Sequence, residues 1–409
     1  MDLPLSDHPL THLANPAARR GPPPGSVSAL LPPAEVTAAR EEIAGWPGYA
    51  ATPLVDLRGL ARAAGFDALL YKHEASRFGL GSFKALGGAF AVLRVLQRAL
   101  EEAGVAAPVR SADLRAGKFA EHTARITVTC ATDGNHGRSV AWGARMFGCR
   151  CVIYLHETVS AGRERAIARH GAEIRRVPGT YDDAVRKAAE EAAAAGWIVV
   201  SDTSYSGYLE IPRQVMLGYT VMVEEIVEQL GDGPPPTHLF LQGGVGGLAA
   251  AVAARFWQHC GDARPRVVVV EPDRAACLFE SARRGRPVAV AGDLDTLMAG
   301  LACGEPSLLA WEILAVAADD FLTVPDAAAV ETMRLLAFPP AGDPPLVAGE
   351  SAVAGLAAAL LSRRDPELSR ALGLTAGSRP LFIGSEGATD PETWQRLVGV
   401  APDTVEEGV

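Results

Sequence analysis

Short apolar runs alternate with longer alanine-rich segments from Tyr71 onward, and this alternation constrains the fold more than any other feature. Continuous apolar strands separated by helices are typical of parallel sheets that helices cover on both faces. The predicted strands are residues 124–132, 149–157, 197–203, 237–244, 266–272 and 379–386. The predicted helices are residues 84–103, 136–147, 181–195, 211–229 and 248–260. The sequence therefore predicts an α/β fold with parallel sheets flanked by helices.

The length of 409 residues suits two domains, at about 150 residues for each. The chain begins with a proline-rich segment of little periodicity, so we expect residues 1–50 to form an N-terminal arm, laid over the body or partly disordered. We expect a smaller α/β domain over residues 85–205. It should be inserted into a larger domain formed by residues 51–84 and 206–409.

Composition and charge exclude several classes of protein. Hydrophobic residues make up 48% of the chain, which is enough for a large core, and the 38 basic and 48 acidic side chains give a net charge of −10. An acidic chain is a poor nucleic-acid binder, because phosphate neutralisation needs a basic surface. No apolar run approaches the roughly 18 residues of a membrane span, and the N-terminus does not resemble a signal peptide. With its scattered cysteines, the sequence predicts a soluble, cytoplasmic protein that binds neither membrane nor nucleic acid.

Three predicted strands end in small or glycine-rich turns that open a helix, at residues 131–137, 242–247 and 384–390. Ligands of open α/β sheets gather where the carboxyl ends of strands meet helix N-termini. The three turns therefore predict one composite binding site.

Lys84 lies at the start of an apolar helical pattern, in the segment Gly-Ser-Phe-Lys-Ala. The helix dipole disfavours a cation at this end, and burial would favour the neutral amine as well. A neutral lysine amine is a nucleophile toward an aldehyde, which is the Schiff-base use of lysine. Spacing alone leaves open the alternative of an ordinary surface lysine.

Gly243, Gly244, Val245, Gly246 and Gly247 follow an apolar strand and precede a helix. Glycines at this place let several backbone N–H groups converge on an anion. The pattern is neither the dinucleotide fingerprint nor the lysine-bearing Walker loop, so a monophosphate is the ligand that fits it best. A tight strand–helix turn without a ligand remains the alternative.

The loop at residues 132–137 offers several donors and the carboxylate of Asp133, which could act as an acid–base group or could cap the following helix. Ser385 follows a late strand and could donate its hydroxyl to a ring nitrogen. His136, His156 and His170 have no cysteine or carboxylate at zinc-ligand spacing, so no metal site is predicted.

Taken in order, these segments resemble the fold-type II, tryptophan synthase β-like, pyridoxal 5′-phosphate enzymes. The stretches at residues 71–92, 131–144, 209–222 and 296–306 are similar to those of the diaminopropionate ammonia-lyases within that group. The resemblance runs from about Pro53 to Asp390, and FGLGSFKALGGA with TDGNHG carries its specificity. It implies a pyridoxal 5′-phosphate cofactor, a small amino-acid substrate, a role in amino-acid catabolism and a homodimer.

The resemblance also implies a role for each matching residue. Lys84 is expected to bind the cofactor covalently, Asn135 to bind its 3′-oxygen, and Ser385 to lie beside its pyridine nitrogen. The glycine loop, Gly243, Gly244, Val245, Gly246 and Gly247, is expected to bind its phosphate. The residues expected to bind substrate are Ser82, Thr132, Asp133, Gly134 and His136.

In this family, the lysine takes the α-proton from the L-isomer and the aspartate takes it from the D-isomer. The resemblance therefore implies that Lys84 and Asp133 are the catalytic residues, acting on both isomers of 2,3-diaminopropionate to give pyruvate and two ammonia. Serine and threonine dehydratases tend to carry a small apolar residue where Asp133 stands. A dehydratase and a non-catalytic regulatory protein on the same fold remain the alternatives. A reversible disulfide between Cys277 and Cys303 is a further hypothesis.

Overall fold

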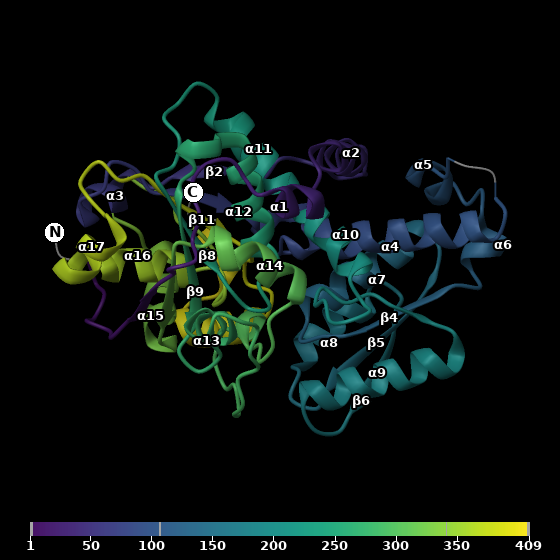
Figure 1. The fold of residues 1–409 in the computed structure, drawn as a ribbon. Coiled ribbons are helices and arrows are strands. Elements are labelled where there is room, and N and C mark those ends of the chain that lie inside the picture. The colour runs from purple at the N-terminus through teal and green to yellow at the C-terminus, as the bar shows by residue number, and fades with distance from the viewer. Residues whose placement is uncertain (1–2, 106–107, 341, 407–409) are drawn as a thin grey trace. The chain divides into compact units, whose positions relative to one another are not determined.

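The structure is a computed structural model that describes residues 3–105, 108–340 and 342–406, and it divides into two compact units (Figure 1). The first unit consists of Met1–Pro33, Ala50–Ser82 and Met222–Val409, and the second of Ala34–Tyr49 and Phe83–Val221. These boundaries differ from the predicted ones, because the segments 34–49 and 206–221 belong to the second unit. Both units are α/β folds, which confirms the predicted fold class.

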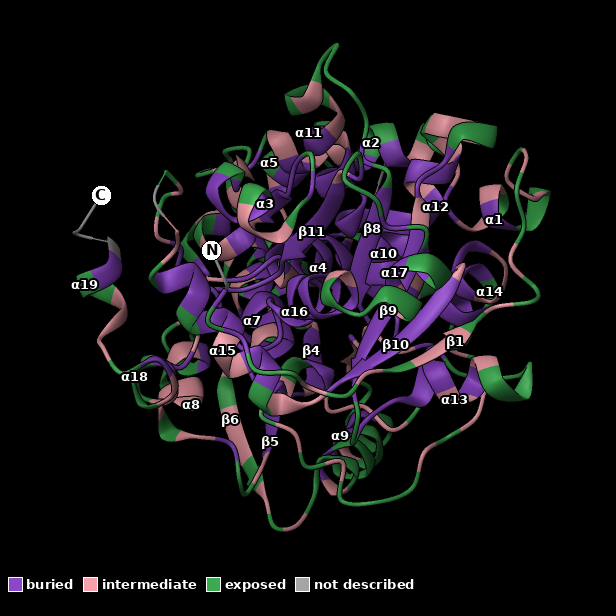
Figure 2. Cartoon of the chain, turned by 90° about the vertical axis from the view of Figure 1, so that its left-hand side faces the viewer, coloured by how far each residue is buried: buried purple, intermediate pink, exposed green. Residues whose placement is uncertain are grey.

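The first unit is built on a seven-stranded sheet with the order β1-β10-β9-β8-β11-β3-β2. The edge strands β1 and β2 are antiparallel to their neighbours, and the other pairs are parallel. The strands are β1 (Thr11–Ala14), β2 (Leu54–Asp56), β3 (Leu70–His73), β8 (His238–Gln242), β9 (Arg266–Pro272), β10 (Asp320–Val324) and β11 (Pro380–Gly384). Figure 2 shows the central strands as buried, which explains their continuous apolar sequences.

Helix α16 packs against β8, β9, β10 and β11, while α12 packs against β8, and α13 against β9 and β10. The α-helices of this unit are α1 (Gly25–Leu30), α3 (Arg58–Ala64), α11 (Val221–Leu230), α12 (Gly247–Cys260), α13 (Cys277–Arg284), α14 (Leu308–Ala317), α15 (Asp326–Ala337), α16 (Ala354–Arg364), α17 (Pro366–Leu372), α18 (Pro391–Val398) and α19 (Pro402–Glu406). Three short 3₁₀ turns lie at Glu74–Gly79, Gly261–Ala263 and Ala299–Leu301.

The second unit is built on a four-stranded parallel sheet with the order β6-β5-β4-β7. Its strands are β4 (Thr127–Ala131), β5 (Arg150–His156), β6 (Glu173–Val177) and β7 (Ile198–Val199). Its helices are α2 (Pro33–Ala44), α4 (Lys84–Glu102), α5 (Ser111–Arg115), α6 (Ala120–Thr123), α7 (Asn135–Phe147), α8 (Ala161–Ala168), α9 (Tyr181–Ala195) and α10 (Glu210–Tyr219). Local sequence signals define both ends of α9. Thr180 and Asp183 form a capping box at its start, and Gly196, in the left-handed region at φ +67°, ends it.

Two predicted elements differ from the structure. The helix expected over residues 211–229 is two helices, α10 and α11, because the chain breaks at Thr220, whose hydroxyl donates to the carbonyl of Leu217. The strand expected over 197–203 ends at Val199, which leaves Asp202 in the loop that follows. Among the described residues, no helix has both the length and the apolar character needed to cross a membrane.

Residues 3–33 of the predicted N-terminal arm belong to the first unit. Its strand β1 extends the sheet, with Thr11 opposite Thr323. Residues 1 and 2 of the predicted arm lie outside the described residues.

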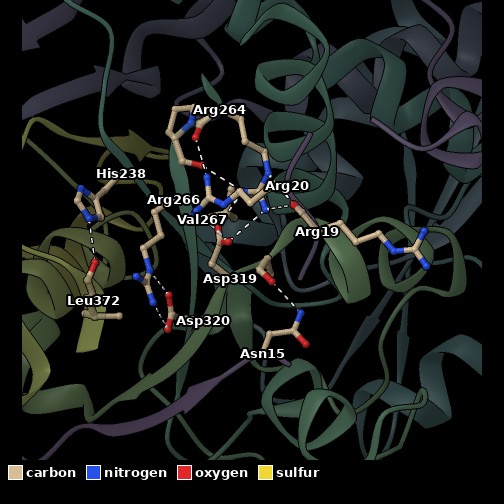
Figure 3. A network of polar contacts seen from close by, with 12 residues as sticks. Asn15, Arg19, Arg20, His238, Arg264, Arg266, Val267, Asp319, Asp320 and Leu372 are labelled. Atoms are coloured by element: carbon tan, nitrogen blue, oxygen red, sulfur yellow. Dashed lines mark hydrogen bonds and ion pairs between the residues drawn. The ribbon is translucent and has the colours of Figure 1, made fainter. Parts of the chain in front are cut away.

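Asp319 connects this segment to the sheet (Figure 3). Its carboxylate accepts hydrogen bonds from Arg264 at 2.7 Å and from the backbone of Val267 at 2.8 Å, and it pairs with Arg20 at 3.0 Å. Its backbone carbonyl accepts the N–H of Asn15. Since the Arg264 side chain is 1% exposed, Asp319 neutralises a buried cation and holds the segment around Asn15 and Arg20 at the same time.

We predict that Asp319→Ala lowers the free energy of unfolding by about 3–5 kcal/mol, because it leaves the buried Arg264 guanidinium without its carboxylate. The N-terminal segment should also become open to proteolysis. Urea unfolding and limited proteolysis measure the two effects.

Asp295→Ala is the matched control, because Asp295 pairs with Arg274 where both side chains are exposed. Its effect should stay below about 1 kcal/mol. Equal effects of the two substitutions would contradict the role of Asp319.

Candidate functional site

Candidate residues of the second unit lie at the carboxyl ends of three adjacent parallel strands. Asp133 follows β4, His156 ends β5, and Asp202 follows β7. Parallel pairing brings these ends to one edge of the sheet, which is the ligand-binding edge of α/β folds.

Helix α4 begins at Lys84 and packs closely against both α7 and α10 through glycines. A Cβ on Gly218 of α10 would lie 2.3 Å from the carbonyl oxygen of Leu86, and one on Gly88 would lie 1.9 Å from the hydroxyl oxygen of Ser139 in α7. Side chains at these positions would push the helices apart. The glycines therefore fix the first turn of α4, and with it the position of Lys84.

The amine of Lys84 forms a hydrogen bond and ion pair with the carboxylate of Asp202. It also lies 5.4 Å from the ring centroid of Phe83 and 5.8 Å from that of Tyr219. Burial alone would raise the pKa of Asp202, but the charge of Lys84, together with His136 and with hydrogen bonds from Lys84 and the backbone, outweighs burial and holds that pKa well below its usual range. Asp202 thus stabilises the protonated amine, an effect opposite in sign to that of the helix dipole.

His136 lies beside the same carboxylate, with its Nδ1 atom 3.8 Å from Asp202. Its Nε2 atom is 2.8 Å from the carbonyl oxygen of Val200, which can only accept, so Nε2 carries a proton. Burial lowers the pKa of His136 and favours the neutral ring. Nδ1 then presents a lone pair, and it has no hydrogen-bond partner within the described part of the chain.

The loop that carries Asp133 is held by Thr132. Its hydroxyl oxygen accepts the N–H groups of Gly134, at 3.0 Å, and Gly137, at 3.1 Å. Gly134 has φ +152°, which favours glycine, and the next residue, Asn135, begins α7. The predicted substrate-binding residues Thr132 and Gly134 therefore also shape the loop, while the carboxylate of Asp133 lies 2.6 Å from Nε2 of His156.

The glycine loop of the first unit connects β8 to α12. Gly243 donates its N–H to the carbonyl of Val270, but the N–H groups of Gly244 and Val245 donate to no acceptor among the described residues. Gly244 and Gly246 have φ values of +62° and +97°. Two open N–H groups next to a helix N-terminus suit a phosphate, so the loop fits the phosphate of pyridoxal 5′-phosphate.

Glu271, at the end of β9, lies directly behind this loop. A Cβ on Gly243 would be 2.5 Å from its Cγ atom. Its carboxyl group accepts the N–H groups of Leu278 at 2.9 Å and Phe279 at 2.7 Å. Burial raises the pKa of Glu271 to about 8, against the opposing effect of these two hydrogen bonds.

Ser385 follows β11 and is buried, and the loop it opens contacts the segment that leads toward α4. Ser82 forms a bridge with Glu386, and Gly387 donates its N–H to the carbonyl of Gly81 at 3.0 Å. The structure thus brings the predicted residues Ser82 and Ser385 into neighbouring loops of the first unit.

Lys84 is one of four lysines in the chain. Lys72 is fully buried and pairs with Glu225 at 2.7 Å, whereas Lys118 and Lys187 are exposed and pair with carboxylates at the surface. Lys84 is therefore the lysine whose place, at the carboxyl edge of a parallel sheet and partly exposed, suits a covalent bond to a cofactor.

Comparison with known proteins agrees with this geometry. Residues 46–374 match the family model described as pyridoxal-phosphate dependent enzyme, and this match defines the class of the protein. A diaminopropionate ammonia-lyase from Salmonella typhimurium is 39% identical over 363 residues, which cover 86% of this chain and 89% of the relative.

Two crystal structures of the Escherichia coli diaminopropionate ammonia lyase are similar to the whole fold. The complex with D-serine has a TM-score of 0.87 at 34% identity and covers 96% of this chain and 98% of that one. The complex with an aminoacrylate–PLP azomethine reaction intermediate has a TM-score of 0.85 at 35% identity, with coverage of 97% and 98%. The chain belongs to the diaminopropionate ammonia-lyase family of pyridoxal-phosphate dependent enzymes.

Two residues at this edge, Asp202 and His156, are not identified by any sequence motif. Asp202 was expected inside a strand, although an aspartate that ends an apolar run is the available signal. The histidine pattern suggests only a metal-ligand role for His156, and it excludes that role.

All six cysteines lie in the described part of the chain, and none forms a disulfide. Cys277 donates its thiol to the carbonyl of Gly244 at 3.4 Å.

We predict that Gly243→Ala weakens cofactor binding by at least about tenfold, because the new methyl group would displace Glu271 or the loop itself. Titration of the apo-protein with pyridoxal 5′-phosphate, followed by absorbance, measures the change. Gly25→Ala is the control, since nothing lies within 4 Å of a Cβ there. Unchanged cofactor affinity in Gly243→Ala would contradict the proposed phosphate loop.

The raised pKa of Glu271 predicts a dependence of stability on pH. The folded protein binds the proton of Glu271 up to about pH 8, whereas the ordinary value is 4.5. This contribution to stability is complete below pH 4.5 and is lost as the pH rises through about 8, by up to about 1.4 kcal/mol per pH unit. Glu271→Gln should flatten that slope in urea unfolding, and Glu312→Gln, at an exposed position of α14, should not. Parallel slopes for wild type and Glu271→Gln would contradict the prediction.

Proposed function

We propose that this enzyme eliminates both amino groups of 2,3-diaminopropionate, giving pyruvate and two molecules of ammonia, and that it accepts both the D- and the L-isomer. The observation that carries the proposal is the ion pair of Lys84 with Asp202 at the carboxyl ends of parallel strands. The similarity to diaminopropionate ammonia-lyases over most of the chain supports the choice of substrate.

The cofactor roles follow from the residues that suit each part of it. We propose that Lys84 bonds the cofactor, that Asn135 binds its 3′-oxygen, and that Ser385 lies beside its pyridine nitrogen. Residues 243–247 are assigned to its phosphate. When bound, pyridoxal phosphate withdraws the electron pair that the departing α-proton leaves on the substrate. A serine hydroxyl beside the ring nitrogen favours loss of a leaving group, because it protonates that nitrogen less than a carboxylate would.

Two bases on the protein account for two isomers. Lys84 takes the α-proton of the L-isomer, and Asp202 holds its amine in place. Asp133 takes the α-proton of the D-isomer, since its carboxylate is 35% exposed and lies at the end of the adjacent loop. Ser82, Thr132, Gly134 and His136 are assigned to the substrate.

The location and assembly of the enzyme are also proposals. We propose a cytoplasmic homodimer that serves amino-acid catabolism, which the bacterial relatives of this family support. Gel filtration with light scattering tests the dimer.

We predict that the holoenzyme releases two ammonia for each pyruvate from either isomer of diaminopropionate, with little product from D-serine, L-serine or L-threonine. Ammonia and 2-keto acid assays measure the ratio. One ammonia per keto acid from serine or threonine alone would make the enzyme a dehydratase. No product from any of the five would leave a non-catalytic protein that binds the cofactor.

We predict that Asp133→Ala lowers kcat for the D-isomer by about 10²–10⁴-fold and changes kcat for the L-isomer much less, because it removes one of the two bases. Steady-state kinetics on each isomer measure the difference. Asp113→Ala, at a partly exposed carboxylate in α5, is the control. Unchanged turnover of the D-isomer would contradict the role of Asp133.

A further inference from the structure

Asp133 and His156 are held together by the sheet itself. Strands β4 and β5 pair in parallel, with Ala131 opposite Tyr154. Asp133 and His156 each lie two residues beyond this pair, so both come to the same edge of the sheet. Asp133 Oδ1 and His156 Nε2 are 2.6 Å apart. The relative position of the two residues is therefore set by strand register together with the Thr132 hydrogen bonds that hold the loop after β4.

The contacts of the imidazole fix which atom donates. A carboxylate only accepts, so Nε2 of His156 donates its proton to Asp133. Nδ1 is 2.9 Å from the hydroxyl of Thr158, which can donate to it or accept from it. The ring of Tyr181 meets the imidazole edge-on, with centroids 6.3 Å apart at 87°. The ring is thus held on three sides, and its side chain is 14% exposed.

The same contact orients the carboxylate of Asp133. Oδ1 is occupied by His156, whereas Oδ2 has no hydrogen-bond or ion-pair partner among residues 3–105, 108–340 and 342–406. One oxygen is therefore anchored and the other is available to a substrate. A general base works best when a neighbouring residue holds one carboxylate oxygen in place and leaves the other available to the substrate.

We propose that His156 is a positioning residue, which orients the carboxylate of Asp133 for proton abstraction from the D-isomer of diaminopropionate. The inference rests on the function proposed above. The α-proton moves from Cα to Oδ2 of Asp133, the electron pair left on Cα forms the Cα–Cβ double bond, and the β-ammonium group leaves as ammonia with the Cβ–N electron pair. Asp133 then releases its proton to water. The L-isomer uses the amine of Lys84 instead, so its turnover does not depend on His156.

The test uses two variants of the holoenzyme. His156→Phe keeps a ring against Tyr181 and removes the donor, whereas His156→Gln keeps an N–H donor. We expect His156→Phe to lower kcat for the D-isomer by about tenfold or more, with KM and the L-isomer changed less than about twofold. His156→Gln should recover most of the lost kcat. His170→Phe, at a histidine outside this contact, should change neither isomer.

A second readout does not depend on turnover. The imidazole N–H proton of His156 should give a downfield resonance in the ¹H NMR spectrum of the holoenzyme without substrate. The resonance should be absent in His156→Phe and should move upfield in Asp133→Asn, because a neutral amide is a weaker acceptor than a carboxylate. Absence of this resonance in the wild type overturns the inference.

The outcomes separate this inference from the function on which it rests. Equal losses on both isomers in His156→Phe, or no loss on the D-isomer, overturn the positioning role while the lyase activity stands. Wild-type turnover of the L-isomer alone overturns the role of Asp133 as a base and this inference with it, again without affecting the lyase activity. Failure of the wild type on both isomers is the result that overturns the proposed function itself.

Discussion

Parallel strand pairing is the constraint on which both units depend. It places the carboxyl ends of neighbouring strands at one edge, where helix N-termini supply N–H groups. In the first unit this edge carries the glycine loop after β8 and Ser385 after β11. In the second it carries Asp133, His156 and Asp202. The positions of the candidate site residues therefore follow from the sheet topology.

Ionisable side chains lie at these edges, and their environment decides the protonation state that each one favours. Asp202 balances the amine of Lys84, and this cation, together with His136 and hydrogen bonds, lowers the pKa of Asp202 against the effect of burial. Glu271 has no cationic partner among the residues that the structure describes: two backbone N–H groups donate to its carboxyl group, and burial raises its pKa. A carboxyl group that holds its proton adds no repulsion toward an anion, which is consistent with the position of Glu271 behind the glycine loop that we propose binds the phosphate.

Much of the fold could be predicted, since continuous apolar runs and alanine-rich helices leave few alternatives to parallel sheets. The loops at 132–137 and 243–247 could be placed because their glycines follow strands directly. Strand β1 could not be foreseen, because an edge strand of four partly exposed residues has no apolar run. Asp202 and His156 were missed because their importance comes from partners 118 and 23 residues away, which periodicity does not report.

The central claim is that Lys84, held by Asp202 at the edge of the parallel sheet, is the residue that bonds the cofactor. Borohydride reduction of the holoenzyme, followed by peptide mass spectrometry, tests it most directly, because the chain has only four lysines. The account predicts a reduced pyridoxyl group on Lys84 and none on Lys72, Lys118 or Lys187. A label on another lysine, or a holoenzyme that reduction leaves unlabelled, would contradict it.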